Sequence, residues 1–152
     1  MKKKVIVLCT GNSCRSQIAE GYLRNLAENT FDVVSAGLEP SVINPKAIQV
    51  MAEDEIDISN HTSKNVDQFV GQEFDYIITV CGNAKERCPV FPGQGKRIHW
   101  SFLDPADATG SEEEILTVFR KVRDQIKQKL TGFVSEFKKS MGFTIKNNED
   151  KK

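Results

Sequence analysis

The chain has 152 residues, of which 39% are hydrophobic, enough for one domain with a buried core and too few for two. Its 21 basic and 21 acidic side chains cancel, which excludes proteins that recruit nucleic acid or an anionic membrane through a global charge. Polar residues follow the short apolar stretch 5–9, so the sequence predicts neither a signal peptide nor a membrane span. We expect a cytoplasmic protein, and a monomer because no spare apolar face is evident.

Apolar runs alternate with helical patterns along the chain. Strands are predicted at 5–9, 31–37, 74–81 and 97–100. Helical spacing predicts one helix over 18–28 and a second that begins at Pro45. A further helix is expected near 61–69, with Thr62 or Ser63 as its N-cap.

A long helix is predicted at the C-terminal end, because Ser111 and Glu114 have the spacing of a capping box. Its apolar face is expected to comprise Ile115, Phe119, Val122, Ile126, Leu130, Phe133 and Phe137. The polar residues 141–152 are expected to form a disordered tail. Strands that alternate with helices predict a single α/β domain over 1–140, with a mostly parallel sheet covered on both faces.

The stretch after the first strand has the features of an anion cradle. Cys9 ends that strand, and the carboxyl edge of a parallel sheet is where ligands bind. Gly11 is expected to permit a tight turn, and a helix is expected to begin near Arg15, a planar bidentate donor for a tetrahedral oxyanion. The predicted oxyanion loop comprises Thr10, Gly11, Asn12, Ser13, Cys14, Arg15 and Ser16. Its donors favour a nucleophilic thiolate at Cys9, although Cys9 as a small buried residue is the alternative. Cys14 is expected to be inert.

Six stretches together carry a resemblance to a known family: "CTGNSCRSQIAEG", "SAG", "NPKAI", "IDISNHTS", "CGNAKERCP" and "DPAD". They resemble the thioredoxin-coupled arsenate reductases, which share the fold and loop of the low-molecular-weight protein tyrosine phosphatases. The resemblance extends from the first strand to the long C-terminal helix. It implies a four-stranded parallel sheet flanked by helices, of the flavodoxin-like, Rossmann type, and a role in arsenic detoxification. It also implies that Asp104 protonates the leaving oxygen.

The remaining cysteines suggest which reaction the loop serves. Reduction of arsenate to arsenite takes two electrons, and a dithiol that becomes a disulfide supplies two. Cys81 is expected on the same sheet edge as Cys9, and Cys88 follows seven residues later. If the linker is helical it must unravel, because helical spacing separates the two by about 10 Å and a disulfide tolerates about 7 Å between Cα atoms. We hypothesise a relay in which Cys9 attacks arsenic, Cys81 attacks Cys9 and Cys88 attacks Cys81. Reduced thioredoxin then supplies the electrons, without a tightly bound cofactor.

Other residues are expected to support the loop. In the resembling family, side chains at Asn12, Ser16, Glu20, Ser35 and Thr62 organise it. Some members bind a potassium ion beneath the loop through an aspartate at the position that is Lys64 here. This departure argues against potassium, and the Lys64 ammonium is a candidate replacement. The alternative is that Lys64 is a solvated helix residue.

Three other functions remain open from the sequence. A phosphatase acting on phosphate monoesters uses the same loop, although such enzymes typically have aromatic residues after the Asp-Pro, where this chain has Ala106. A non-catalytic anion-binding or redox-sensing module is the second alternative. Zinc binding is the third, but the cysteines lack two close ligand pairs, and neither His61 nor His99 belongs to a helical histidine pair.

Overall fold

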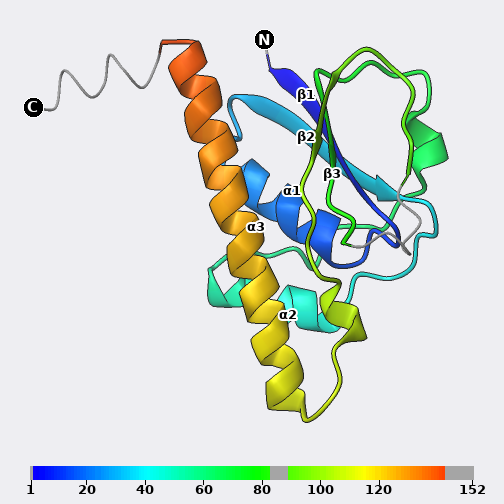
Figure 1. Cartoon of the computed structure of the whole chain (residues 1–152), viewed down its shortest axis with the longest axis vertical. Helices are drawn as coiled ribbons and strands as arrows, with labels where there is room; N and C mark the ends of the chain where they lie inside the picture. The colour runs from blue at the N-terminus through cyan, green and yellow to red at the C-terminus, as the bar shows by residue number, and fades with distance from the viewer. Residues whose placement is uncertain (1, 83–88, 143–152) are drawn as a thin grey trace, which may run out of the picture.

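A parallel sheet of four strands is the frame of this computed structural model, which describes residues 2–82 and 89–142 (Figure 1). The strands are β1 (Lys3–Cys9), β2 (Phe31–Gly37), β3 (Tyr76–Thr79) and β4 (Lys96–His99). The α-helices are α1 (Arg15–Ala27), α2 (Pro45–Glu53) and α3 (Glu112–Ser140), and two 3-10 helices are η1 (Val66–Phe69) and η2 (Pro105–Asp107). The predicted α/β class with a four-stranded parallel sheet is confirmed.

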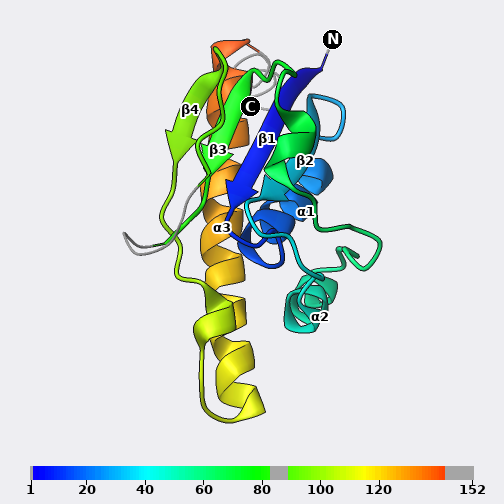
Figure 2. The same ribbon diagram turned by 90° about the vertical axis from the view of Figure 1, so that its right-hand side faces the viewer.

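The strand order fixes where a ligand can bind. The order is β2-β1-β3-β4, so the chain moves to one side of β1 to form β2 and to the other side to form β3 (Figure 2). A crevice opens beyond the carboxyl end of the strand at which the order reverses. Cys9 is the last residue of β1, and Gly37 of β2 lies beside it in the register. The nucleophile predicted from sequence therefore stands at this crevice.

Alternating side chains of β1 belong to two different cores. Val5 and Val7 pack with α1, α2 and α3 in the larger cluster, whereas Ile6 and Leu8 face the opposite side of the sheet. That second face is covered by η1 and by loop side chains such as Phe74, rather than by an α-helix, within residues 2–82 and 89–142. The sheet is therefore covered on both faces, as expected, and the α-helices of the described residues pack on one of these faces.

The helix expected near 61–69 is shorter than predicted and has a different cap. Only η1 forms, and Asn65 caps it by accepting from the backbone N–H of Asp67. The residues before it pair with the sheet edge instead: Gly37 N donates to Lys64 O at 2.9 Å, and Gly37 forms a parallel bridge with Asn65. Their backbone groups are therefore used by β2 and are unavailable to a helix.

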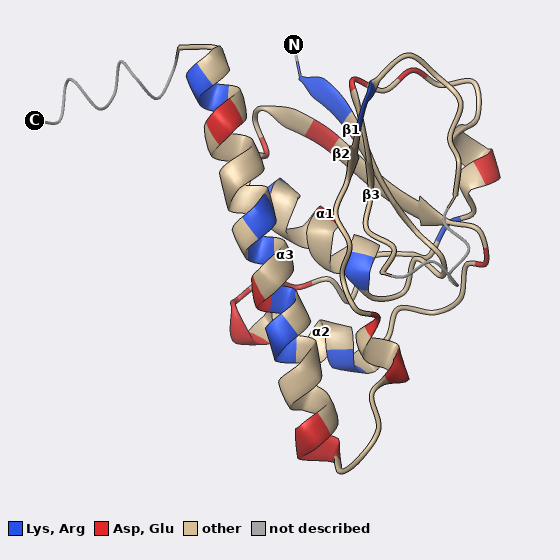
Figure 3. Cartoon of the chain, in the orientation of Figure 1, with Lys and Arg blue, Asp and Glu red and all other residues tan. Residues whose placement is uncertain are grey.

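The first half of the long helix α3 is held by charged and polar groups. Its predicted capping box is present: Ser111 Oγ accepts a hydrogen bond from Glu114 N, and Glu114 Oε1 accepts one from Ser111 N. Figure 3 shows acidic residues at the start of α3 and basic residues further along. Arg120 and Arg123 both bind Glu53 at the end of α2, at 2.9 and 2.7 Å. These hydrogen bonds hold the pKa of Glu53 below its usual value, and the hydrogen bond from Arg120 has the largest effect.

The predicted apolar face of α3 packs against the rest of the core, with Phe133 and Phe137 against Phe31. Of the expected tail 141–152, only 141 and 142 lie within the described residues. Across residues 2–82 and 89–142, none of the helices combines the length and the apolar character needed to cross a membrane.

The capping box generates a stability prediction. Ser111→Ala removes the side chain that caps the first turn of α3, and we expect a loss of about 1 kcal/mol in the free energy of unfolding. Ser111→Asp keeps a capping oxygen and is expected to retain most of the stability. Urea denaturation of the three proteins measures the difference, and an unchanged midpoint for Ser111→Ala would contradict it.

Candidate active site

A small cavity of about 270 Å³ lies beyond the carboxyl end of β1. Its lining comprises Cys9, Thr10, Gly11, Ser13, Cys14, Arg15, Asp104 and Asp107. A larger cavity of about 590 Å³ lies at the opposite edge of the sheet, lined by Lys4 near the start of β1 and by Lys96 at the start of β4. That cavity has no cysteine in its lining, whereas the smaller one contains Cys9, so the smaller one is the candidate active site.

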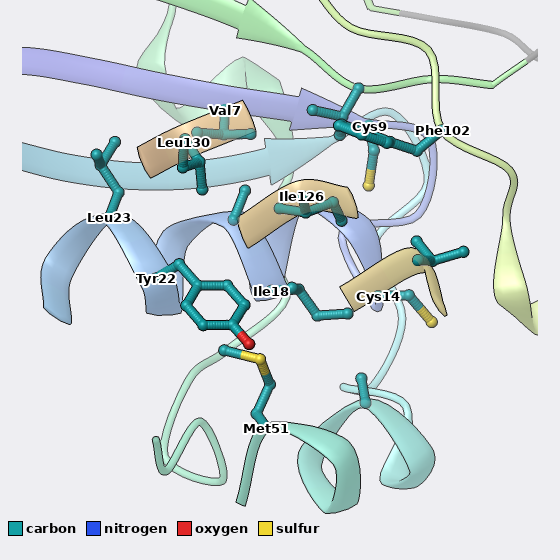
Figure 4. Packing of buried hydrophobic residues seen from close by; sticks show 14 of the residues in the cluster. Val7, Cys9, Cys14, Ile18, Tyr22, Leu23, Met51, Phe102, Ile126 and Leu130 are labelled. Carbon is teal, nitrogen blue, oxygen red and sulfur yellow. The ribbon is translucent and has the colours of Figure 1, made fainter. Parts of the chain in front are cut away.

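Cys9 is held at the base of this cavity by two hydrogen-bonding groups. Only 2% of its surface is exposed, and Figure 4 shows it at the end of β1, next to Phe102. Asn12 N donates to Cys9 Sγ at 3.2 Å, and Ser16 Oγ lies 2.9 Å from the same sulfur. The nucleophile predicted from the sequence is thus held by donors near the N-terminus of α1.

Asn12 is the centre of the loop. It is fully buried, and its backbone has a left-handed φ of 50°, a conformation that asparagine tolerates better than most residues. Its side-chain Nδ2 donates to Ser16 Oγ at 2.7 Å and to Ser35 Oγ at 2.9 Å. A tight turn was expected at Gly11, but among the described residues of the loop it is Asn12, and not Gly11, that has a positive φ. The turn is therefore made one residue later than expected.

The hydrogen bonds from Asn12 continue to a buried carboxylate. Ser35 Oγ donates to Glu20 Oε1 at 2.6 Å, and Glu20 Oε2 accepts from Arg24 Nε at 2.9 Å. Because Asn12 donates to Ser16 Oγ, the hydroxyl hydrogen of Ser16 is available to Cys9 Sγ. The structure thus joins four residues expected to support the loop, Asn12, Ser16, Glu20 and Ser35, in one chain of contacts that ends at the nucleophile.

Gln17 and His61 also belong to this support, although the sequence analysis gave them no role in it. The buried Gln17 Nε2 donates to Asn12 O, Asn12 Oδ1 and Thr62 O, at 3.1, 3.0 and 3.0 Å. Gln17 Oε1 lies 3.0 Å from His61 Nδ1, which must therefore carry a hydrogen. Burial lowers the pKa of His61. The sequence around Gln17 gives no local signal for this role, because its partner His61 is 44 positions away.

The expected supports Thr62 and Lys64 act through their backbone. Thr62 O accepts from Gln17, and Lys64 N donates to Asn12 Oδ1 at 2.9 Å. The Lys64 ammonium donates to Thr62 O at 2.6 Å and lines a cavity of about 440 Å³ with Glu20 and Arg24. Burial lowers the pKa of Lys64, and the nearby Glu20 carboxylate acts in the opposite direction. Lys64 is half-buried rather than a solvated helix residue.

Arg15 and Asp104 form an ion pair at the lining of the cavity. Arg15 is buried, donates from Nη1 to Phe102 O at 3.1 Å and places Nη2 3.3 Å from Asp104 Oδ2. The other carboxylate oxygen of Asp104 accepts from Ala106 N at 3.0 Å, which caps η2. Asp104 is partly exposed, so an ion or a leaving oxygen in the cavity can reach it from the solvent side.

The four cysteines have different environments. Cys9 and Cys14 are free thiols, and burial raises the pKa of Cys14 to about 12, which keeps it neutral and inert. Cys81 is buried just beyond β3, at the same sheet edge as Cys9, and is disulfide-bonded. Cys88 lies outside the described residues. Within residues 2–82 and 89–142, no three or more histidine, cysteine or carboxylate side chains gather as a metal site.

Gly37 fills a position that any other residue would obstruct. A Cβ atom there would lie 2.6 Å from Thr10 O, 2.8 Å from Cys9 O and 2.9 Å from Asn12 N. These are backbone atoms of the loop, so they cannot rotate away as a side chain does. The end of β2 therefore touches the underside of the loop only because residue 37 is glycine.

Comparison with known proteins identifies the family of this chain. The model of the family described as low molecular weight phosphotyrosine protein phosphatase matches residues 4–142. An arsenate reductase of Oceanobacillus iheyensis is 49% identical over 134 residues, covering 88% of this chain and 96% of that protein, and one of Bacillus subtilis is 46% identical with the same coverage. A solved structure described as an arsenate reductase in the phosphate binding state aligns with a TM-score of 0.75 and 36% identity, covering 88% of this chain and 98% of that one.

The chain therefore belongs to the low molecular weight phosphotyrosine protein phosphatase family. Within that family, it resembles the proteins named arsenate reductase, as the sequence motifs predicted. A tyrosine phosphatase from T. tengcongensis shares the fold at a TM-score of 0.69 with 19% identity.

Gly37 provides a test of the loop geometry. We expect Gly37→Ala to displace the loop, lower the free energy of unfolding by about 1–3 kcal/mol and abolish protection of Cys9 by sulfate against iodoacetamide. Gly132→Ala is the matched control. A Cβ at this position within α3 meets nothing within 4 Å, so the change is expected to stabilise the helix by about 0.5–1 kcal/mol. Equal sulfate protection in both variants would contradict the assignment.

Proposed function

We propose that this enzyme reduces arsenate to arsenite through a relay of Cys9, Cys81 and Cys88, with thioredoxin as the reductant. The observation that carries the proposal is the buried Cys9, with donors aimed at its sulfur, on the same sheet edge as the disulfide-bonded Cys81. A phosphatase needs only the first of these cysteines. The relatives named arsenate reductase support the same reaction.

Binding of the oxyanion uses the loop and Arg15. The backbone N–H groups from Thr10 to Ser16 and the N-terminus of α1 supply positive potential where no side chain caps that helix. Arg15 offers its guanidinium once the anion competes with Asp104 and Phe102 O for it. The cavity of about 270 Å³ suits a small tetrahedral anion such as arsenate, with phosphate and sulfate as competitors.

The relay accounts for both electrons. The Cys9 thiolate forms a bond to arsenic and displaces one oxygen, which leaves as water after Asp104 donates a proton. The Cys81 thiolate then attacks Cys9 Sγ, and the electron pair of the sulfur–arsenic bond passes to arsenic, which leaves as arsenite. Cys88 attacks Cys81, so Cys9 is released and a Cys81–Cys88 disulfide remains.

Reduction of that last disulfide closes the cycle. A thioredoxin dithiol transfers two electrons to Cys81 and Cys88 and becomes a disulfide itself. We place the reaction in the cytoplasm, where thiols are kept reduced, and we propose that the enzyme acts as a monomer without a tightly bound cofactor. Arsenic detoxification is the cellular role that we propose, in keeping with the relatives named arsenate reductase.

Substituting each relay cysteine tests the mechanism. With thioredoxin, thioredoxin reductase and NADPH, wild type is expected to oxidise NADPH when arsenate is added, whereas Cys9→Ser, Cys81→Ser and Cys88→Ser are each expected to lose steady turnover. Melting curves verify that the variants fold. If arsenate drives no oxidation while wild type, but not Cys9→Ser, hydrolyses a phosphate ester, the protein is a phosphatase and the relay is wrong.

The cation beneath the loop is proposed to be the Lys64 ammonium rather than potassium. The residues there do not suit a metal cation, because Lys64 Nζ already binds Thr62 O and Arg24 already binds Glu20. A potassium ion in that cavity would meet two fixed positive charges.

This proposal predicts that stability and turnover are the same in potassium chloride and sodium chloride at equal ionic strength. Lys64→Asp replaces the ammonium by a carboxylate, which can bind a cation. The melting temperature of this variant is therefore expected to be higher in potassium chloride than in sodium chloride. A potassium-specific increase in the wild type would contradict the replacement.

A further inference from the structure

The mouth of the anion cavity carries a second carboxylate beside Asp104. Asp107 lines the same cavity as Cys9 and Arg15. The 3-10 helix η2 fixes the spacing of the two carboxylates: Asp104 caps its start, Asp107 ends it, and Asp107 N donates to Asp104 O at 3.1 Å. Asp107 is exposed, so it stands on the solvent side of the cavity.

The two carboxylates differ in how their charge is compensated. Asp104 faces the Arg15 guanidinium at 3.3 Å and accepts from Ala106 N. Over the described ranges 2–82 and 89–142, the carboxylate of Asp107 has neither an ion pair nor a hydrogen bond. The helix α3 packs against η2, but its Arg120 is bound to Glu53 and Glu113. The charge of Asp107 is therefore uncompensated at the lining of the cavity.

The cavity has an unusual balance of charge for an anion site. One fixed positive side chain, Arg15, is set against Asp104 and Asp107, and Cys14 is neutral. The backbone donors of the loop must overcome this excess. Because Coulomb energy is proportional to the ligand's charge, the repulsion from Asp107 is twice as large for a dianion as for a monoanion at the same place.

We propose that Asp107 is a specificity-determining residue that disfavours doubly charged tetrahedral anions, such as sulfate and phosphate-ester dianions, relative to singly charged oxyanions. The inference rests on the proposed function for its substrate: near neutrality arsenate is present as both a singly and a doubly protonated ion, and Asp107 selects the singly charged, doubly protonated form. Asp104 differs from Asp107, because the Arg15 guanidinium lies 3.3 Å from its carboxylate and the proposed mechanism uses it as a proton donor.

The test measures charge selection without any turnover. Cys9 is alkylated with iodoacetamide, which is neutral, and with iodoacetate, which is a monoanion of similar shape. Because both reagents react with the same sulfur, the ratio of the two rates does not depend on the reactivity of the sulfur itself. In Asp107→Asn we expect iodoacetate to gain about two- to fivefold relative to iodoacetamide at low ionic strength, and the gain to shrink as salt is added.

Sulfate provides the dianion. The affinity for sulfate is measured by protection of Cys9 against iodoacetamide. In Asp107→Asn this affinity is expected to rise by a larger factor than the iodoacetate-to-iodoacetamide rate ratio does. The factor for sulfate should approach the square of the factor for iodoacetate, because the repulsion of a dianion is twice that of a monoanion. Asp32→Asn is the matched control, because it removes the same charge from an exposed residue near the start of β2, at the opposite edge of the sheet. It is expected to change neither quantity.

Two results would overturn the inference. An unchanged iodoacetate ratio and sulfate affinity in Asp107→Asn would show that its charge does not reach the cavity, and an equal change in Asp32→Asn would show an effect of net charge alone. Neither readout requires electron transfer. A protein that fails to reduce arsenate but shows the Asp107 effect would therefore contradict the proposed function and leave the charge selection standing.

Discussion

The side-chain amide of Asn12 is the interaction on which the site depends. It bridges Ser16 on α1 and Ser35 on β2 while its own backbone donates to Cys9 Sγ. The Asn12 amide is buried, and its oxygen and nitrogen both have hydrogen-bond partners, so it has one favourable orientation. Turning the amide by 180° would place its NH₂ group against the donors that now bind its oxygen. The loop is thereby fastened to two rigid elements, so that the sulfur and the N–H groups around it are arranged before an anion arrives.

The local parts of this site could be predicted from the sequence, and the long-range parts could not. Cys9 and Arg15 follow from a strand, a turn and a helix start that are adjacent in the chain, and the capping box of α3 is equally local. Gln17 and Gly37 were missed because their importance comes from atoms brought close only by the fold. The short η1 was mistaken for a longer helix because pairing with β2 takes the preceding backbone groups.

One scaffold in this family is compatible with two chemistries. An anion loop with a nucleophilic cysteine is sufficient for hydrolysis of a phosphate ester, and reduction adds the need for two further electrons. Cys81 stands just beyond β3, the strand beside β1, so the parallel sheet places a second cysteine at the same edge as Cys9. Under the proposed relay, the difference between the two chemistries is the position of a few sulfur atoms around an otherwise shared loop.

The most direct test of the relay is a single turnover of fully reduced enzyme with arsenate in the absence of thioredoxin, followed by mass spectrometry of the cysteines. The relay predicts one arsenite per chain, a disulfide between Cys81 and Cys88, and a free thiol at Cys9. Arsenite formed with Cys9 oxidised and Cys88 still a free thiol would contradict the last transfer. No arsenite at all from the reduced protein would contradict the reaction itself.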